Sequence, residues 1–168
     1  MPTVPDERLD AEWVRAWYEE VDAALKELME SFLARHGFPP GRNEVRLATG
    51  SSHKATEALV ELTPIPSDLT TMYWVIAEAS LPDVDNGYFI HSPSTVAAHF
   101  REYGFIQIDG EEPALVFAGD GGGHLFAVAG TGRVWKSATA SWFDQFDLDA
   151  AGLKEFLERL ARRIAGQS

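Results

Sequence analysis

A glycine-rich loop is the first feature of the sequence that suggests chemistry, because loops of this kind can bind phosphate. Residues 119–123 read Gly-Asp-Gly-Gly-Gly. A phosphate-binding loop presents backbone amides at the N-terminus of a helix and usually carries a lysine. This loop has no lysine, leads into the apolar run that follows His124, and has Asp120 where an anion would sit. We therefore predict a plain turn between two strands.

Aspartates and histidines could also do chemistry, as metal ligands. Asp83, Asp85 and Asp120 could hold a hard cation together, but only the first two acids of the calcium-loop pattern match. The five histidines show neither a His-Glu-x-x-His pair nor the His-His spacing of a zinc site, and the chain has no cysteine. The sequence thus predicts no metal site and no cofactor. A metal-dependent hydrolase that uses the three aspartates stays an alternative.

A serine beside a histidine could act as a nucleophile, and Ser52 precedes His53. A nucleophile elbow, however, reads Gly-x-Ser-x-Gly between a strand and a helix, and an acid must orient the histidine. Here the two residues are only isolated neighbours. The other acids cluster in turns, where carboxylates are normally solvated. We therefore predict no catalytic residue and a protein that is not an enzyme.

The net charge of −12 restricts the partners of the protein. Residues 1–37 hold nine acids and four bases, residues 38–150 hold fifteen and six, and residues 151–168 hold two and four. A nucleic-acid binder needs the opposite charge, so we predict neither a nucleic-acid nor a membrane partner. The acidic surface would instead attract a basic protein.

The N-terminal residues and the length of the apolar runs indicate the cellular compartment of the protein. The N-terminal residues lack the pattern of a signal peptide, and no apolar run approaches the roughly 20 residues of a membrane helix. The absence of cysteine fits a reducing compartment. We expect a cytoplasmic protein.

An antiparallel meander of short strands must position the glycine-rich loop. Glycines separate three β-prone runs, at 114–118, 124–129 and 133–136. The second connection, Gly130-Thr131-Gly132, suits a three-residue hairpin turn because glycine accepts positive φ. Further short strands are predicted at 45–48, 88–90 and 105–108.

Helical periodicity predicts one long helix and four shorter ones. Apolar residues recur at three- and four-residue steps over 7–36, and Gly37 ends that pattern. The shorter helices are predicted over 54–62, over 67–79, from Ser92 to near Gly104, and over the apolar face from Leu153 to Ile164, introduced by residues 147–149. With no repeat and no linker, residues 1–168 are predicted to form one domain.

The order of three segments resembles the SUKH superfamily. They are LPDVDNGYFIH at 81–91, ALVFAGDGGGHLFAVAGTGRVWKS at 114–137 and SWFDQFDLDAAGLKEFLERL at 141–160. The likeness covers roughly residues 64–161, and the long N-terminal helix over 7–36 looks like an addition. The superfamily includes bacterial immunity proteins of polymorphic toxin systems and Smi/Knr-type regulators of fungal cell-wall synthesis.

The resemblance implies an α+β fold with a twisted, mostly antiparallel β-sheet, flanked by helices on one side and at the ends. It also implies a binding protein without catalytic residues. The positions that match the glycine-turn motif of the superfamily shape the sheet; they are Asp120, Gly121, Gly122 and Gly123.

The function implied is that of an immunity protein, or antitoxin, that covers a toxin. The acidic charge agrees, because nucleases commonly present basic clefts. The acids expected to contact such a toxin are Asp83, Asp85, Glu111, Glu112, Asp144 and Asp147. A protein–protein interaction or scaffold domain with another cellular client stays the alternative.

Overall fold

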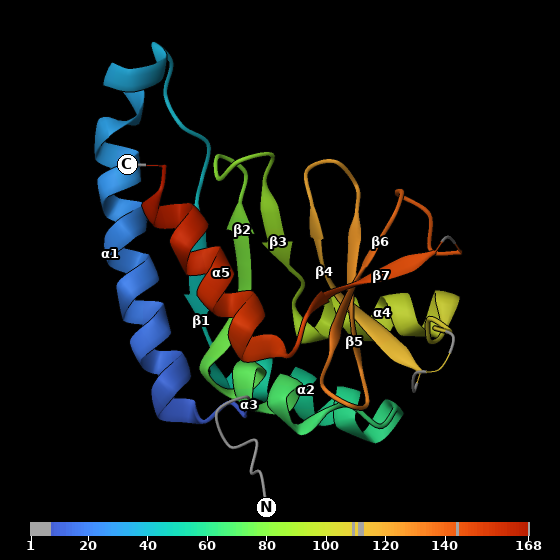
Figure 1. The fold of residues 1–168 in the computed structure, drawn as a ribbon. Helices are drawn as coiled ribbons and strands as arrows, with labels where there is room; N and C mark the ends of the chain where they lie inside the picture. Colours follow the sequence, from blue (N-terminus) through green and yellow to red (C-terminus); the bar gives the residue numbers. More distant parts are fainter. Residues whose placement is uncertain (1–7, 109, 111–112, 144, 168) are drawn as a thin grey trace, which may run out of the picture.

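The fold is built on one antiparallel sheet of seven strands, in which neighbouring strands are also consecutive in the sequence (Figure 1). The structure is a computed structural model that describes residues 8–108, 110, 113–143 and 145–167. Within these residues the strands are β1 (Glu44–Leu47), β2 (Ile76–Leu81), β3 (Tyr88–Ile90), β4 (Ala114–Asp120), β5 (Leu125–Ala129), β6 (Val134–Ser137) and β7 (Phe146–Ala150). The predicted meander over 114–136 is confirmed as β4, β5 and β6, in antiparallel pairs.

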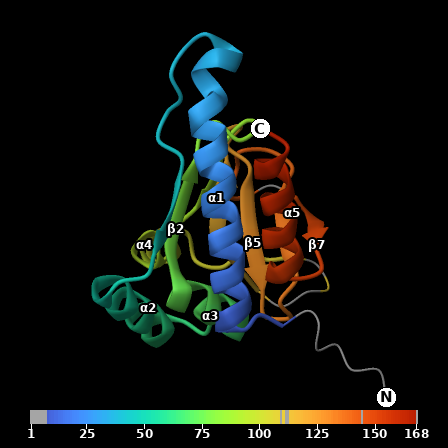
Figure 2. The same ribbon diagram turned by 90° about the vertical axis from the view of Figure 1, so that its left-hand side faces the viewer.

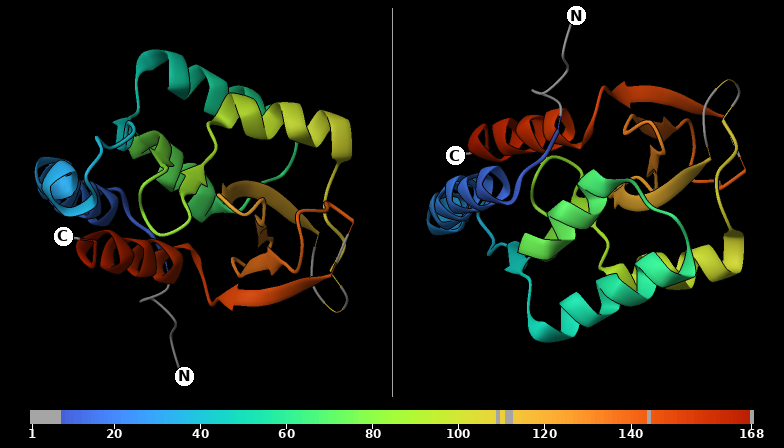
Figure 3. Two further views of the ribbon diagram at one scale, coloured as in Figure 1. Left: turned by 90° about the horizontal axis from the view of Figure 1, so that it is seen from above. Right: turned by 90° about the horizontal axis from the view of Figure 1, so that it is seen from below.

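The α+β class is confirmed, because the chain combines one antiparallel sheet with separate helices. The helices cover both sides of the sheet, so the expectation of helices on one side and at the ends is wrong. The helices are α1 (Ala11–His36), α2 (Gly50–Leu62), α3 (Ser67–Val75), α4 (Pro93–Tyr103) and α5 (Leu153–Ala165). Seen along the sheet, α2 and α4 lie together on one side, and α1 lies beside α5 on the other (Figure 3). Among the described residues, no helix has both the length and the apolar character that crossing a membrane requires.

The long N-terminal helix belongs to the core of the protein. Six of its residues are buried in the main core, namely Val14, Trp17, Val21, Leu25, Leu28 and Phe32. The indole N–H of Trp17 donates to the backbone carbonyl of Leu157 in α5 at 2.6 Å. Figure 2 shows α1 running beside α5, on the side of the sheet opposite to α2 and α4. The helix is therefore a structural part of the domain and not an appendage to it.

The ends of α1 follow from its capping residues. The helix begins at Ala11, four residues later than predicted, because the Asp10 side chain accepts a hydrogen bond from the backbone N–H of Trp13 at 2.8 Å. It ends where Gly37 takes a left-handed conformation with φ 79°, as predicted.

Two strands were missed in the sequence, and both carry residues that periodicity had given to helices. The predicted helix over 67–79 is wrong beyond Val75, because the chain becomes extended and β2 pairs with both β1 and β3. Residues 147–149 belong to β7, the edge strand beside β6, and do not lead directly into a helix. Pairing with β1 and β3 makes residues 76–81 extended, and pairing with β6 makes residues 146–150 extended, so tertiary pairing outweighs the local pattern in both segments.

Two other predictions also differ from the structure. Helix α2 starts at Gly50 and not at Lys54, because Thr49 and Ser52 form a reciprocal capping box. The strand predicted at 105–108 is reduced to a single bridge between Ile106 and Ala114. These differences leave the order of the main elements unchanged.

Asp120 and its glycines fold the turn between β4 and β5. The Asp120 carboxylate accepts hydrogen bonds from the backbone N–H groups of Gly122 at 2.9 Å and His124 at 3.0 Å. Gly123 has φ 84°, which a residue with a side chain rarely adopts. The turn joins two strands and does not open a helix, as predicted for a loop that holds no phosphate.

Gly121 lies where two turns meet. Its backbone N–H donates to the carbonyl of Gly87, in the β2–β3 turn, at 3.0 Å. A Cβ atom on Gly121 would lie 1.5 Å from the backbone oxygen of Asn86. The glycine is therefore required by the close approach of the two backbones.

The β5–β6 turn contains Gly130 and Gly132. The backbone N–H of Gly132 donates to the carbonyl of Ala129 at 2.8 Å, and Gly132 has φ 95°. This is the positive φ that the sequence predicted for the hairpin.

Candidate protein-binding surface

Of the acids proposed to contact a partner, Asp83 is held inside the protein's own structure. Its Oδ2 accepts hydrogen bonds from the backbone N–H of Gly41 and from the Asn43 side-chain amide, both at 2.7 Å. Asn43 is buried, and its Oδ1 accepts the backbone N–H of Asp83 at 2.9 Å. Asp83 thus fastens the segment after α1 to the β2–β3 turn.

Asp85 joins the same turn to the end of α5. Its carboxylate lies 3.1 Å from the Arg163 guanidinium and accepts a hydrogen bond from the Gln167 side chain at 2.8 Å. Arg163 also lies over the ring of Tyr88, 5.6 Å from its centroid. The charge of Asp85 is therefore partly neutralised at the surface.

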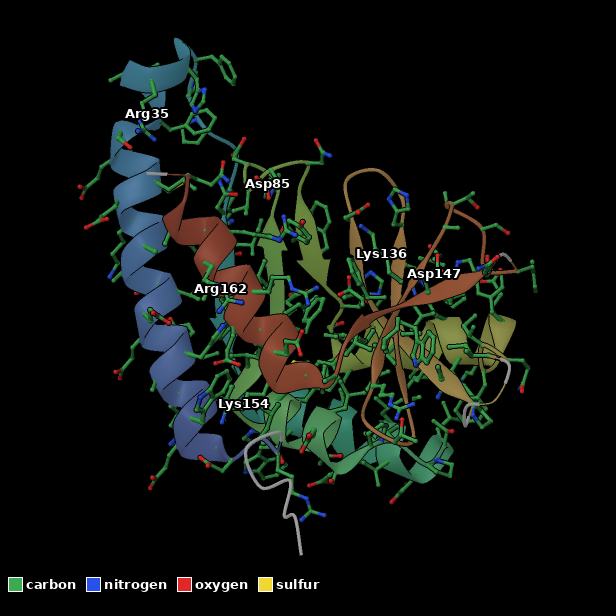
Figure 4. The ribbon with its side chains drawn as sticks, in the orientation of Figure 1. Arg35, Asp85, Lys136, Asp147, Lys154 and Arg162 are labelled. Carbon is green, nitrogen blue, oxygen red and sulfur yellow. The ribbon has the colours of Figure 1, made fainter. Side chains whose placement is uncertain are left out.

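Asp147 is exposed on the edge strand β7, where it accepts a hydrogen bond from the Gln145 side chain at 2.9 Å. Figure 4 shows Asp147 and Asp85 at separate places, on β7 and on the β2–β3 turn. The structure therefore does not bring Asp83 and Asp85 together with Asp147. The other three predicted contact residues, Glu111, Glu112 and Asp144, lie outside the described residues.

The three aspartates of the hydrolase alternative do not converge either. Asp83 binds the Gly41–Asn43 segment, Asp85 pairs with Arg163, and Asp120 accepts from its own turn. In the described part of the chain, no three of His, Asp and Glu gather in an arrangement that could hold a metal ion. The geometry thus gives this alternative no support.

The different settings of two aspartates predict different effects on stability. Replacing Asp83 by alanine removes two hydrogen bonds and leaves the buried Asn43 amide only its longer contacts, at 3.4 Å, with Met29 Sδ and the Gly41 carbonyl, so we expect a loss of about 2 kcal/mol in the free energy of unfolding. Replacing the exposed Asp147 is expected to change it by less than about 0.5 kcal/mol. Urea unfolding of both variants measures the difference. Equal losses would contradict the structural role of Asp83.

An exposed aromatic patch was not singled out from the sequence. It consists of Tyr103 at the end of α4 and of Trp142 and Phe143 in the β6–β7 loop. The rings of Tyr103 and Trp142 stack, with centroids 4.4 Å apart and planes 21° apart, and Phe143 meets Tyr103 at 6.5 Å. Phe143 is 85 % exposed and Tyr103 39 % exposed. The patch arises only because the β6–β7 loop packs against α4, a contact that the sequence does not indicate.

Two histidines connect this patch to the interior. The His99 ring contacts Trp142 at 5.2 Å and His91 at 5.3 Å, edge to face in both cases. The Nδ1 atoms of both histidines are buried, and neither has a hydrogen-bond partner among the described residues. Burial, and secondarily the proximity of His99, lowers the pKa of His91 to about 4.

This lowered pKa predicts a pH-dependent stability. The unfolded chain binds a proton at His91 near the ordinary pKa of 6.5, whereas the folded protein does so only near 4. The contribution of neutral His91 is thus fully present above pH 6.5 and is lost as the pH falls from 6.5 to 4. In urea unfolding over this range, His91→Gln is expected to lose less stability than the parent protein. Parallel pH profiles for the two proteins would contradict the assignment.

A narrow cleft between α5 and the sheet gathers positive side chains. Lys136, Arg159 and Arg163 line it, together with the rings of Tyr88 and Phe126. Each cation already has an acidic partner: Lys136 lies 3.7 Å from Asp120, Arg159 lies 3.3 Å from Asp149, and Arg163 pairs with Asp85. The cations therefore hold α5 against the turns and strands beneath it.

Comparison with known proteins identifies no relative: no protein-family model matches the chain, and no curated protein matches it significantly. The likeness to the SUKH superfamily therefore rests on the three sequence segments and stays a prediction.

Proposed function

We propose that this chain is an immunity protein that binds and neutralises a basic, nuclease-type toxin in the cytoplasm. The observation that carries the proposal is the excess of 26 acids over 14 bases in the chain. The resemblance of residues 64–161 to the SUKH superfamily supports the same function. In this mechanism no covalent bond is made or broken.

The acidic residues are distributed over the surface. This distribution favours long-range attraction of a basic partner, rather than a single acidic contact site. Helix α1 holds six acids and three bases, and residues 102–153 hold eight acids and two bases. Figure 1 shows α1 at the opposite end of the molecule from β7, which carries the exposed Asp147, so exposed acids lie at both ends. A basic partner would be attracted from many directions and then oriented by local contacts.

Toxicity rescue tests the function directly. The product of the adjacent reading frame is expressed with and without this chain, and the two purified proteins are mixed to measure their stoichiometry. We expect restored growth and a stable complex. Failure to rescue cells from every toxin candidate encoded nearby would overturn the immunity function. A complex with a non-toxic cellular protein would favour the interaction-domain alternative.

Salt dependence tests the electrostatic part of the mechanism. The Debye length falls from about 30 Å at 0.01 M salt to about 10 Å at 0.1 M. We expect the association rate, measured by stopped flow, to fall about tenfold over this range. A rate that does not change with salt would remove charge from the mechanism and leave binding intact.

A further inference from the structure

We propose that the aromatic patch of Tyr103, Trp142 and Phe143 is the docking surface for an arginine-bearing face of the basic partner. This inference rests on the proposed function and names the part of the surface that makes the contact. None of these three residues belongs to the acidic set predicted from the sequence. Three properties of the patch support this assignment: its exposure, its fixed geometry and the charge of its surroundings.

The patch combines exposure with a defined geometry. Phe143 is 85 % exposed, although burying a phenylalanine side chain stabilises a protein by about 1.5–3 kcal/mol. Tyr103 and Trp142 form a stacked pair at 4.4 Å, anchored by the contact of Trp142 with His99 at 5.2 Å. Large aromatic side chains that are already ordered lose little entropy on binding and are frequent at the centre of interfaces.

Side-chain hydrogen bonds fix the loop that carries two of the rings. The backbone N–H of Phe143 donates to Ser141 Oγ at 3.1 Å, and the N–H of Ser141 donates to Thr139 Oγ1 at 3.2 Å. The buried Ser137 hydroxyl donates to the Thr139 carbonyl. These bonds position the loop before any partner arrives, which lowers the cost of ordering it on binding.

The charge around the patch selects a cationic partner. In the sequence Glu102 stands next to Tyr103 and Asp144 next to Phe143, Arg101 is the one base within three positions of these residues, and the whole chain has a net charge of −12. Lys136 lies against Asp120 and over the Phe126 ring, in the cleft beneath α5. A second copy of this chain would bring its own net charge of −12 to the interface, so self-association is disfavoured.

Aromatic rings in an acidic setting favour arginine over lysine. The planar guanidinium stacks on an aromatic face and can donate to a carboxylate at the same time, and it is less strongly hydrated than an ammonium group. A nuclease that binds phosphates commonly presents arginines on its substrate-binding face. The partner face expected here is therefore rich in arginine and engages the stacked pair and Phe143.

Two blocked peptides of equal length and charge test this preference without a toxin. One alternates Arg and Gly, and the other alternates Lys and Gly. In NMR titrations we expect the Arg peptide to shift the Trp142 indole N–H and the Phe143 amide, and to bind several-fold more tightly than the Lys peptide. Equal binding of both peptides, or shifts centred on α1, would overturn the docking assignment.

Matched variants test the patch in the complex. Phe143→Ala and Tyr103→Ala are expected to weaken binding of the adjacent gene product at least tenfold. Phe38→Ala is the control, because Phe38 is also an exposed phenylalanine, at 57 %, and lies two residues after α1, the helix that Figure 1 shows at the other end of the molecule. Circular dichroism and urea unfolding check that each variant is folded.

The outcomes separate this inference from the proposed function. If the parent protein rescues cells and the patch variants bind as tightly as the Phe38 variant, the docking surface is wrong and the immunity function stands. If the parent protein rescues no cells while the Arg peptide still binds at Trp142 in preference to the Lys peptide, the immunity function fails and the arginine-binding patch stands.

Discussion

Replacing Trp17 by alanine is expected to lower the free energy of unfolding by about 4 kcal/mol. Only 3 % of this side chain is exposed, and it lies between α1 and α5. Alanine would leave a cavity and would also remove the donor that serves the Leu157 carbonyl at 2.6 Å. For a chain of this length, the midpoint of thermal unfolding should fall by roughly 8–16 °C.

Trp17→Phe separates the two parts of this effect. Phenylalanine keeps most of the apolar contact and loses the indole N–H, so we expect a loss of about 1–2 kcal/mol. Calorimetry and urea unfolding of both variants measure the difference. If Trp17→Ala unfolds within about 1 kcal/mol of the parent protein, α1 does not contribute to the common core as the structure indicates.

Replacing Gly121 by alanine is expected to cost about 3 kcal/mol, at the upper end of what overpacking usually costs. The added Cβ would lie 1.5 Å from the Asn86 oxygen, so the β4–β5 and β2–β3 turns would have to separate. That movement would break the hydrogen bond from Gly121 to Gly87. The neighbouring pairs of β3 with β4, from Tyr88 opposite Asp120 onward, would then be strained.

Gly132→Ala is the matched control for this substitution. Gly132 also lies in a hairpin turn and has φ 95°, but nothing lies within 4 Å of the position its Cβ would take. We expect it to lose only the roughly 1 kcal/mol that positive φ costs a residue with a side chain. Urea unfolding and amide hydrogen exchange in β3 measure both variants. Because Gly121 itself does not have a positive φ, a loss at Gly121 no larger than that at Gly132 would contradict the close approach of the two turns.

How much of the fold could be predicted depended on whether the signal was local. The apolar residues of α1, which include Trp17 and Leu28, recur with a helical period within one continuous segment. The helix and its last residue could therefore be predicted without knowledge of the rest of the chain. Ile76 continues the apolar spacing of α3 but is extended, because pairing with β1 and β3 outweighs helical periodicity. In β7 the alternation of apolar and polar residues covers only five positions, which is too short to distinguish a strand from a turn that precedes a helix.

The candidate surface was harder to predict for a related reason. Acidic residues are visible in a sequence, but their partners are not. Asp83 is recognisable as structural only once Asn43, forty positions away, is found against it. Tyr103 and Trp142 form a patch through a contact between two elements that are 39 positions apart. Charge composition therefore predicts only a class of partner, and the tertiary structure was needed before a docking surface could be proposed.

The hydrogen bond between Trp17 and Leu157 also affects how the protein is made. The two residues are 140 positions apart, so the ribosome releases the α1 segment long before it releases α5. At the usual 5–20 residues per second, the interval is on the order of 10 seconds. During that time the part of the apolar stripe that faces α5, including Trp17, has no permanent cover, although α3 and β1 can already pack against the rest of α1. Chains truncated before α5 would keep that part exposed and are expected to aggregate or be degraded.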